Sequence, residues 1–142
     1  MNHRIFVYGT LKKGFPNHDR YMQSAEKLGS YRTVESYPLA LIGERYVPCM
    51  IDAPGEGKQI EGELYEVDDD CLERLDALER IKKPDGYRRC KIRLRSVAQQ
   101  DAVTLEAYAY LIAPKFAKDQ RSGYLKIYSL ADAKKYKPGK NK

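Results

Sequence analysis

The charged residue with the most unusual placement in this sequence is the glutamate at position 79. Residues 68–80 have the periodicity of an amphipathic helix, and at about 100° per residue Glu79 falls between Leu72 and Leu75 on the apolar side. This position also lies in the last helical turn, where the helix dipole disfavours negative charge. Burial and the dipole both raise the pKa of a carboxyl group, and a carboxyl that titrates near neutral pH suits general acid–base catalysis. The alternative is a frayed helix end, or an ion pair with Arg80 or a following lysine.

A second candidate site is the glycine-containing loop that follows the first apolar run. Residues 5–8 are continuously apolar, and Gly9 and Gly14 punctuate the loop after them. The outline is that of a phosphate-binding loop, but Phe15 and Pro16 stand where such a loop needs Lys and Ser or Thr. Glycine at the end of a buried strand instead lets successive backbone amides converge on a small anion such as a carboxylate. An ordinary strand-to-loop turn is the alternative.

The other reactive side chains give weaker indications. His3 and His18 have no carboxylate at metal-ligand spacing and are expected at the surface. There is no Gly-x-Ser-x-Gly sequence to mark a serine nucleophile. The three cysteines lack Cys-x-x-Cys spacing and lie in apolar segments, so we expect inert core thiols, no disulfide framework and no metal site. The tyrosines that are candidates for the walls of a pocket are Tyr8, Tyr87, Tyr108 and Tyr110.

The elements that must position these candidates are mostly short strands separated by turn residues. Apolar runs and alternation predict strands at residues 4–8, 29–35, 38–42, 46–51, 59–67, 87–97 and 103–111. Besides the helix at 68–80, whose first amides Asp68 can cap, a short helix is expected around 18–25. Many short strands with one clear helix predict an α+β fold, a small mixed β-barrel with flanking helices.

Size and charge indicate how the chain is organised. A chain of 142 residues suits one compact domain, for which we expect residues 1–114. Residues 115–142 hold nine Lys and Arg against two Asp, whereas the rest is near neutral. We expect this basic tail to be solvated and to pack in part on the same domain, with polyanion binding as the alternative. The apolar runs are too short to span a membrane or to serve as a signal peptide, so the expected location is the cytoplasm.

Three motifs occur together in the order and spacing of a known family: YGTL at 8–11, EGELY at 61–65 and LDALE at 75–79. The chain thereby resembles the γ-glutamylcyclotransferase-like (AIG2-like) family over residues 5–110. Within that family, the segment YGTLKKGFPN and the short length are most similar to members that act on γ-glutamyl amines. The ending from Tyr136 to Asn141 is also similar to that subgroup.

The resemblance implies a fold and a site. The fold is a small five- or six-stranded barrel with flanking helices, without a metal or an organic cofactor. Glu79 would be the catalytic acid/base, and whether Asn17 or Tyr87 contacts the substrate is left open. The residues implied for the substrate-binding loop are Tyr8, Gly9, Thr10 and Leu11.

The resemblance also implies an activity. It is the conversion of γ-glutamyl amines, such as the γ-glutamyl-ε-lysine crosslink left by transglutaminases, to 5-oxoproline and a free amine. The partner would be this small-molecule substrate, with no nucleic acid and no membrane, and the chain would act as a monomer. Two alternatives remain: cyclotransfer on other γ-glutamyl amino acids or conjugates, and a non-catalytic carboxylate-binding module with the same fold.

Overall fold

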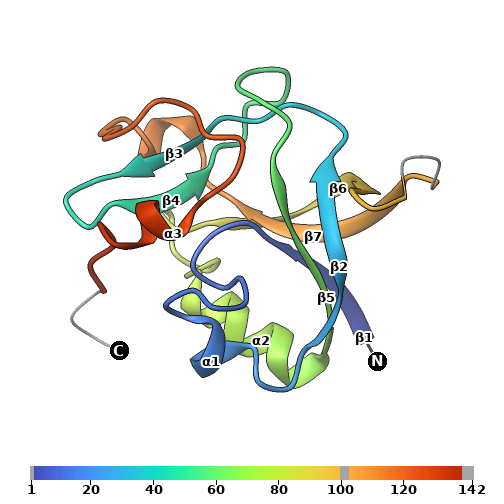
Figure 1. Cartoon of the computed structure of the whole chain (residues 1–142). Coiled ribbons are helices and arrows are strands. Elements are labelled where there is room, and N and C mark those ends of the chain that lie inside the picture. Colours follow the sequence, from blue (N-terminus) through green and yellow to red (C-terminus); the bar gives the residue numbers. More distant parts are fainter. Residues whose placement is uncertain (1, 100–102, 139–142) are drawn as a thin grey trace.

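The computed structural model describes residues 2–99 and 103–138, and a closed β-barrel lies at its centre (Figure 1). The barrel strands are β1 (Asn2–Val7), β2 (Glu26–Thr33), β5 (Glu61–Asp68), β6 (Arg88–Ser96) and β7 (Leu105–Leu111). Their order is β1-β5-β2-β6-β7, with antiparallel neighbours throughout except where β7 meets β1 in parallel and closes the barrel. The predicted α+β class and small mixed barrel are confirmed.

Smaller elements surround the barrel. A separate hairpin is formed by β3 (Leu39–Ile42) and β4 (Val47–Met50). The helical elements are α1 (His18–Tyr21), α2 (Asp69–Leu78), the 3-10 turn η1 (Pro114–Phe116) and α3 (Leu130–Ala133). Helices α1 and α2 lie together on one side of the barrel (Figure 1). Within the described residues, no helix has the length and apolar character needed to cross a bilayer.

The apolar run near the start of the chain is continuous because both faces of β1 are buried in its second half, at residues 5–7. Phe6 points into the barrel, where it packs in one cluster with Leu64 of β5. Ile5 and Val7 point the other way and share a second cluster with Leu75 of α2. Since successive side chains of a strand alternate between its faces, the half of β1 that is covered on both sides has no polar positions, whereas its first three residues are polar and less buried. Strand β1 therefore ties the barrel to α2.

Two expected elements differ from the structure. The helix predicted at residues 18–25 is wrong in length, because it is a single turn that ends at Tyr21. Residues 22–25 form a turn instead, in which the amide of Ala25 donates to the carbonyl oxygen of Met22 at 3.1 Å, and β2 begins directly after it at Glu26. The strand predicted to start at Val103 starts at Leu105 instead, and the side chain of Val103 is 84% exposed.

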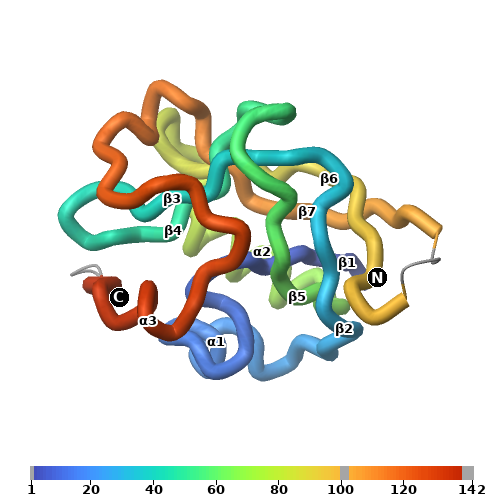
Figure 2. Tube along the Cα trace, turned by 45° about the horizontal axis from the view of Figure 1, so that its top comes forward, coloured from blue at the N-terminus to red at the C-terminus, as the bar shows by residue number. Residues whose placement is uncertain are grey.

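The C-terminal segment lies along the β3–β4 hairpin in both views (Figures 1 and 2). The backbone amides of Arg121 and Leu125 donate to the carbonyl oxygens of Leu41 and Leu39, each at 2.7 Å. Farther along, the side chain of Tyr128 is fully buried. These contacts bring residues beyond 114 to the edge of the site described below.

Candidate active site

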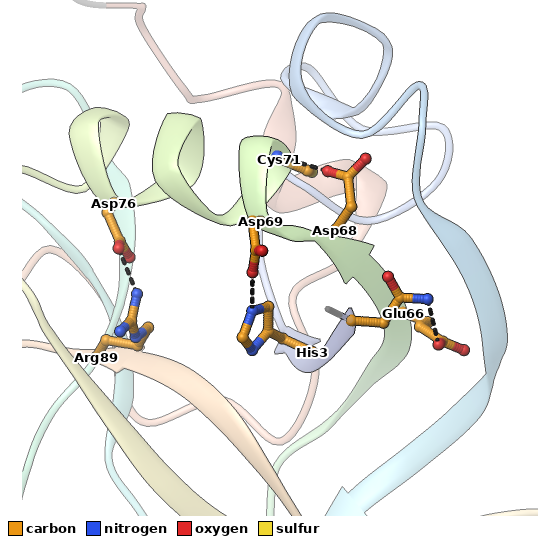
Figure 3. Close-up of polar contacts among 8 residues, drawn as sticks. His3, Glu66, Asp68, Asp69, Cys71, Asp76 and Arg89 are labelled. Carbon is orange, nitrogen blue, oxygen red and sulfur yellow. Dashed lines mark hydrogen bonds and ion pairs between the residues drawn. The ribbon is translucent and has the colours of Figure 1, made fainter.

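Acidic side chains fix helix α2 on the barrel (Figure 3). Near its start, Asp69 Oδ1 lies 2.6 Å from Nε2 of His3 on β1, which makes His3 half-buried rather than fully exposed. In the last turn of the helix, Asp76 forms an ion pair with Arg89 of β6. Strand β1 therefore holds the start of the helix, and β6 holds its C-terminal end, where Glu79 follows.

A tight turn holds Glu79 at that end. Glu79 is the C-cap of α2, and Arg80 after it has a left-handed backbone with φ of 57°. The chain then returns, so that the amide of Tyr87 donates to the carbonyl oxygen of Glu79 at 3.0 Å. Gly86 passes so close that a Cβ atom there would lie 1.9 Å from the carbonyl oxygen of Arg80. Only glycine fits this approach, and the turn depends on it.

Glu79 faces the same cavity as the glycine-containing loop. The cavity has a volume of about 300 Å³ and lies between the end of β1, the end of α2 and the β3–β4 hairpin. Glu79 is half-buried in its wall. The loop residues that line the cavity with it are Tyr8, Gly9, Thr10 and Leu11. The structure thus brings together the two candidate sites that the sequence places almost 70 residues apart.

The loop that lines this cavity has backbone amides without an acceptor in the described part of the chain. Residues 9–12 form a turn in which the amide of Lys12 donates to the carbonyl oxygen of Gly9 at 3.1 Å. On the far side, His18 Nδ1 lies 2.9 Å from the carbonyl oxygen of Leu11, so this half-buried histidine supports the loop. Within residues 2–99 and 103–138, the amides of Thr10 and Leu11 donate to no protein acceptor. Such a turn can bind a small anion through its amides.

Two neighbours set the shape of the loop. Asn17 donates from Nδ2 to the hydroxyl oxygen of Thr10 at 2.9 Å, and its backbone amide donates to the Thr10 carbonyl at 2.9 Å. Gly9 packs on the β3–β4 hairpin, where a Cβ atom would lie 2.7 Å from Cγ of Pro48. Asn17 itself lines the cavity. The loop conformation is therefore fixed before any ligand binds.

Three of the four tyrosines proposed for the walls line the cavity. These are Tyr8, Tyr87 and Tyr110. Tyr108 lies on the same face of β7 as Tyr110 but nearer the other end of the barrel, where Arg89 stands 4.8 Å from its ring centroid. The Tyr8 hydroxyl donates to the carbonyl oxygen of Tyr110 at 2.7 Å, which fixes the first loop residue.

The walls of the cavity shift the pKa of the groups that face it. Burial raises the pKa of Glu79 to about 7. Burial also raises the pKa of Tyr8, with a further contribution from Glu79. The thiol of Cys49, 3.0 Å from the Tyr87 hydroxyl, has a pKa raised to about 12 by burial, as expected for an unreactive core thiol. At neutral pH Glu79 is therefore the group here that exchanges a proton most readily.

The sequence matches the family described as "Gamma-glutamyl cyclotransferase, AIG2-like" over residues 5–131. The chain belongs to this family. The resemblance predicted from the three motifs is thereby confirmed, and the cavity just described is lined by the first of these motifs, YGTL at residues 8–11.

Individual members of the AIG2-like cyclotransferase family are similar to the chain in sequence and in structure. The chain is 45% identical over 96 residues to Gamma-glutamylaminecyclotransferase C of Danio rerio, which covers 65% of the chain and 62% of that protein. It is 42% identical over 111 residues to Gamma-glutamylaminecyclotransferase B of Danio rerio, a match that covers 75% of the chain and 57% of that protein. The chain thus spans about three fifths of the length of these relatives. The crystal structure of an AIG2-like protein from Mus musculus superimposes with a TM-score of 0.82 at 31% identity, covering 99% of both chains.

The raised pKa of Glu79 makes the stability of this family member depend on pH. The folded chain favours the protonated carboxyl, so its stabilising contribution is complete below the ordinary pKa of 4.5 and is lost as the pH rises through about 7. A Glu79→Gln variant has no carboxyl group at this position, so its stability does not fall with pH for this reason. Between about pH 5 and about pH 8.5, its free energy of unfolding relative to wild type is expected to rise by about 2 kcal/mol in urea titrations. A difference that stays constant over this range contradicts the burial of Glu79.

Part of the cavity wall comes from residues that the sequence did not indicate. The β3–β4 hairpin contributes Arg45, Pro48 and Cys49, and the C-terminal segment contributes Tyr136. The sequence did give one indication for Tyr136, because residues 136–141 are similar to the ending of one subgroup of the family. The hairpin residues carried none, since they reach the cavity only through the packing of the hairpin against the barrel.

Proposed function

We propose that the chain is a γ-glutamylamine cyclotransferase, which converts γ-glutamyl amines such as γ-glutamyl-ε-lysine to 5-oxoproline and a free amine. The observation that carries this proposal is Glu79, whose pKa burial raises to about 7, in one cavity with the loop of residues 8–11. The names of the two Danio rerio relatives support the same activity. On this proposal the enzyme is cytoplasmic, acts as a monomer and removes crosslinks that transglutaminases leave.

The proposed reaction is intramolecular. The α-amino nitrogen of the substrate forms a bond to the γ-carbonyl carbon of the same glutamyl group, and the bond from that carbon to the leaving nitrogen breaks. One proton moves from the attacking nitrogen to the leaving nitrogen, so no water is consumed. The substrate carries its own nucleophile, and the reaction therefore needs neither a reactive Ser or Cys nor a metal or organic cofactor. Holding the glutamyl group folded supplies part of the rate.

The loop is proposed to hold the glutamyl half of the substrate. The amides of Thr10 and Leu11 have no protein acceptor in the described part of the chain, and they suit the α-carboxylate or the carbonyl oxygen as it gains charge. The Thr10 hydroxyl already accepts from Asn17, so its role is to hold the turn. In this arrangement, Tyr8 and Gly9 shape the loop and line the cavity beside it.

Glu79 is proposed to move the proton. With a pKa of about 7, protonated and ionised forms coexist at neutral pH. The carboxylate accepts a proton from the attacking amine, and the carboxylic acid then donates one to the leaving nitrogen. A group whose pKa lies near the working pH is effective in both steps.

The proposal is tested by measuring 5-oxoproline release from γ-glutamyl-ε-lysine beside γ-glutamyl-alanine. Release from the lysine conjugate is the expected result. Release from the dipeptide alone would keep the chemistry and assign the chain to the neighbouring activity. No release from either substrate would contradict the proposed enzyme, and a carboxylate-binding module with the same fold would replace it.

A further inference from the structure

Among the charged side chains that line the cavity, one arginine forms no ion pair in the described part of the chain. Besides Glu79, the charged lining residues are Arg45, Arg80 and Asp85. Arg80 and Asp85 form an ion pair with each other, with Nη2 and Oδ1 at 3.2 Å. Arg45 forms no ion pair with any acidic side chain within residues 2–99 and 103–138. One cation at the cavity thus has no anionic partner in this part of the chain.

The side chain of Arg45 is nevertheless held in place by the C-terminal segment. Its Nε donates to the carbonyl oxygen of Lys137 at 2.8 Å, and the amide of Lys137 donates back to the carbonyl oxygen of Arg45 at 2.9 Å. The guanidinium lies 5.9 Å from the ring centroid of Tyr136, which also lines the cavity. Neither Nη group donates to an acceptor in the described residues. The guanidinium is oriented while its two outer nitrogens stay available.

A strained turn sets the position of Arg45 at the tip of the β3–β4 hairpin. The turn closes through the amide of Tyr46, which donates to the carbonyl oxygen of Gly43 at 3.1 Å. Tyr46 has φ of 54°, a left-handed conformation that costs free energy for any residue but glycine. Arg121 supports it from outside, with its guanidinium 5.9 Å from the Tyr46 ring. The neighbours of the turn therefore hold a conformation that the sequence alone disfavours.

Strand β4 separates Arg45 from the catalytic end of the cavity. Cys49, at the far side of the strand, is close enough to Glu79 for the carboxylate to contribute to its raised pKa. From Cys49 back to Val47 the strand covers about 7 Å at its usual rise, and Arg45 lies two residues farther along, in the turn that precedes the strand. Between them, the paired residues Ile42 and Val47 both line the cavity. The cavity therefore has an acid–base end, an apolar middle and a cationic end.

We infer that Arg45 binds a carboxylate on the leaving-amine half of the substrate, an inference that rests on the proposed function. With the glutamyl head at Glu79 and the loop, an aliphatic chain would lie on Ile42 and Val47 and end at the guanidinium. This arrangement selects γ-glutamyl conjugates of amino acids joined through a side-chain amine, in which the carboxylate is remote from the scissile bond. Ordinary γ-glutamyl dipeptides carry that carboxylate next to the scissile bond and do not reach Arg45.

The test compares two substrates that differ by a single group. γ-Glutamyl-ε-lysine carries the remote carboxylate, and γ-glutamylcadaverine is the same molecule without it. Arg45→Gln is expected to lower kcat/KM about tenfold for the lysine conjugate, the usual effect of one charge-assisted hydrogen bond, and at most about twofold for the cadaverine conjugate. Arg45→Lys keeps the positive charge and is expected to recover part of the loss.

Arg95→Gln is the matched control, because Arg95 is exposed on β6, outside the β3–β4 hairpin, and does not line the cavity. The ratio of kcat/KM for the two substrates is expected to stay at the wild-type value in this variant. Equal losses on both substrates in Arg45→Gln would overturn the inference while leaving the cyclotransferase activity in place. No 5-oxoproline from either substrate with the wild-type chain would instead refute the proposed function, and the inference with it.

Discussion

Glu79→Gln is expected to fold normally and to lose at least about 100-fold in turnover, as is usual when a general base is removed. Glutamine has the size and shape of the protonated glutamate, so it fills the same place at the end of α2. It cannot accept a proton from the attacking amine or donate one to the leaving nitrogen. The measurement is the initial rate of 5-oxoproline formation at saturating substrate, with circular dichroism to check the fold.

Glu73→Gln is the control for this change, because Glu73 lies on the exposed face of the same helix. Its turnover is expected to match that of wild type. In the wild-type chain, the rate is expected to depend on a group with a pKa near 7, and Glu79→Gln is expected to lose that dependence. Turnover of the Glu79 variant within a few-fold of wild type would rule out the acid–base role.

The second large effect is expected from Gly86→Ala. The added Cβ would lie 1.9 Å from the carbonyl oxygen of Arg80, which is backbone and cannot swing aside. The turn must open, and the hydrogen bond from the Tyr87 amide to the Glu79 carbonyl opens with it. The free energy of unfolding is expected to fall by more than about 2 kcal/mol, in the upper range for overpacking, with activity reduced as Glu79 moves.

Gly123→Ala provides the comparison, since an added Cβ at that exposed glycine meets nothing within 4 Å. It is expected to change the free energy of unfolding by less than about 0.5 kcal/mol, as for most surface substitutions. Urea denaturation of both variants measures the difference. Equal stability of the two alanine variants would contradict the described turn and the placement of Glu79 that depends on it.

The placement of Glu79 could be predicted from the sequence because it depends on local periodicity. Seven residues are close to two helical turns, so Glu79 had to share a face with Leu72 once the helix formed. The helix starts where its cap predicts, with Asp68 accepting from the amide of Cys71 at 2.8 Å. The loop after β1 could also be predicted, because a buried strand that ends at glycine is a local sequence pattern.

The rest of the site depends on contacts between distant residues. Arg45 reaches the cavity only because the hairpin tip pairs with Lys137, 92 residues later, and no local pattern encodes that pairing. The helix expected at 18–25 ends at Tyr21, and the chain turns there into β2, whose pairing with β5 also joins residues far apart in the sequence. The roles assigned to Glu79 and to residues 8–11 stay predictions until variants are measured. The boundary proposed at residue 114 also stays a prediction.

The most direct test of the proposed chemistry is to identify the products that the purified full chain releases from γ-glutamyl-ε-lysine. Intramolecular attack predicts one molecule of 5-oxoproline for each lysine, with no glutamate. The same substrate acetylated on its α-amine cannot cyclise and is predicted to stay intact. Release of glutamate with lysine, or cleavage of the acetylated substrate, would show attack by water and contradict the cyclotransferase mechanism.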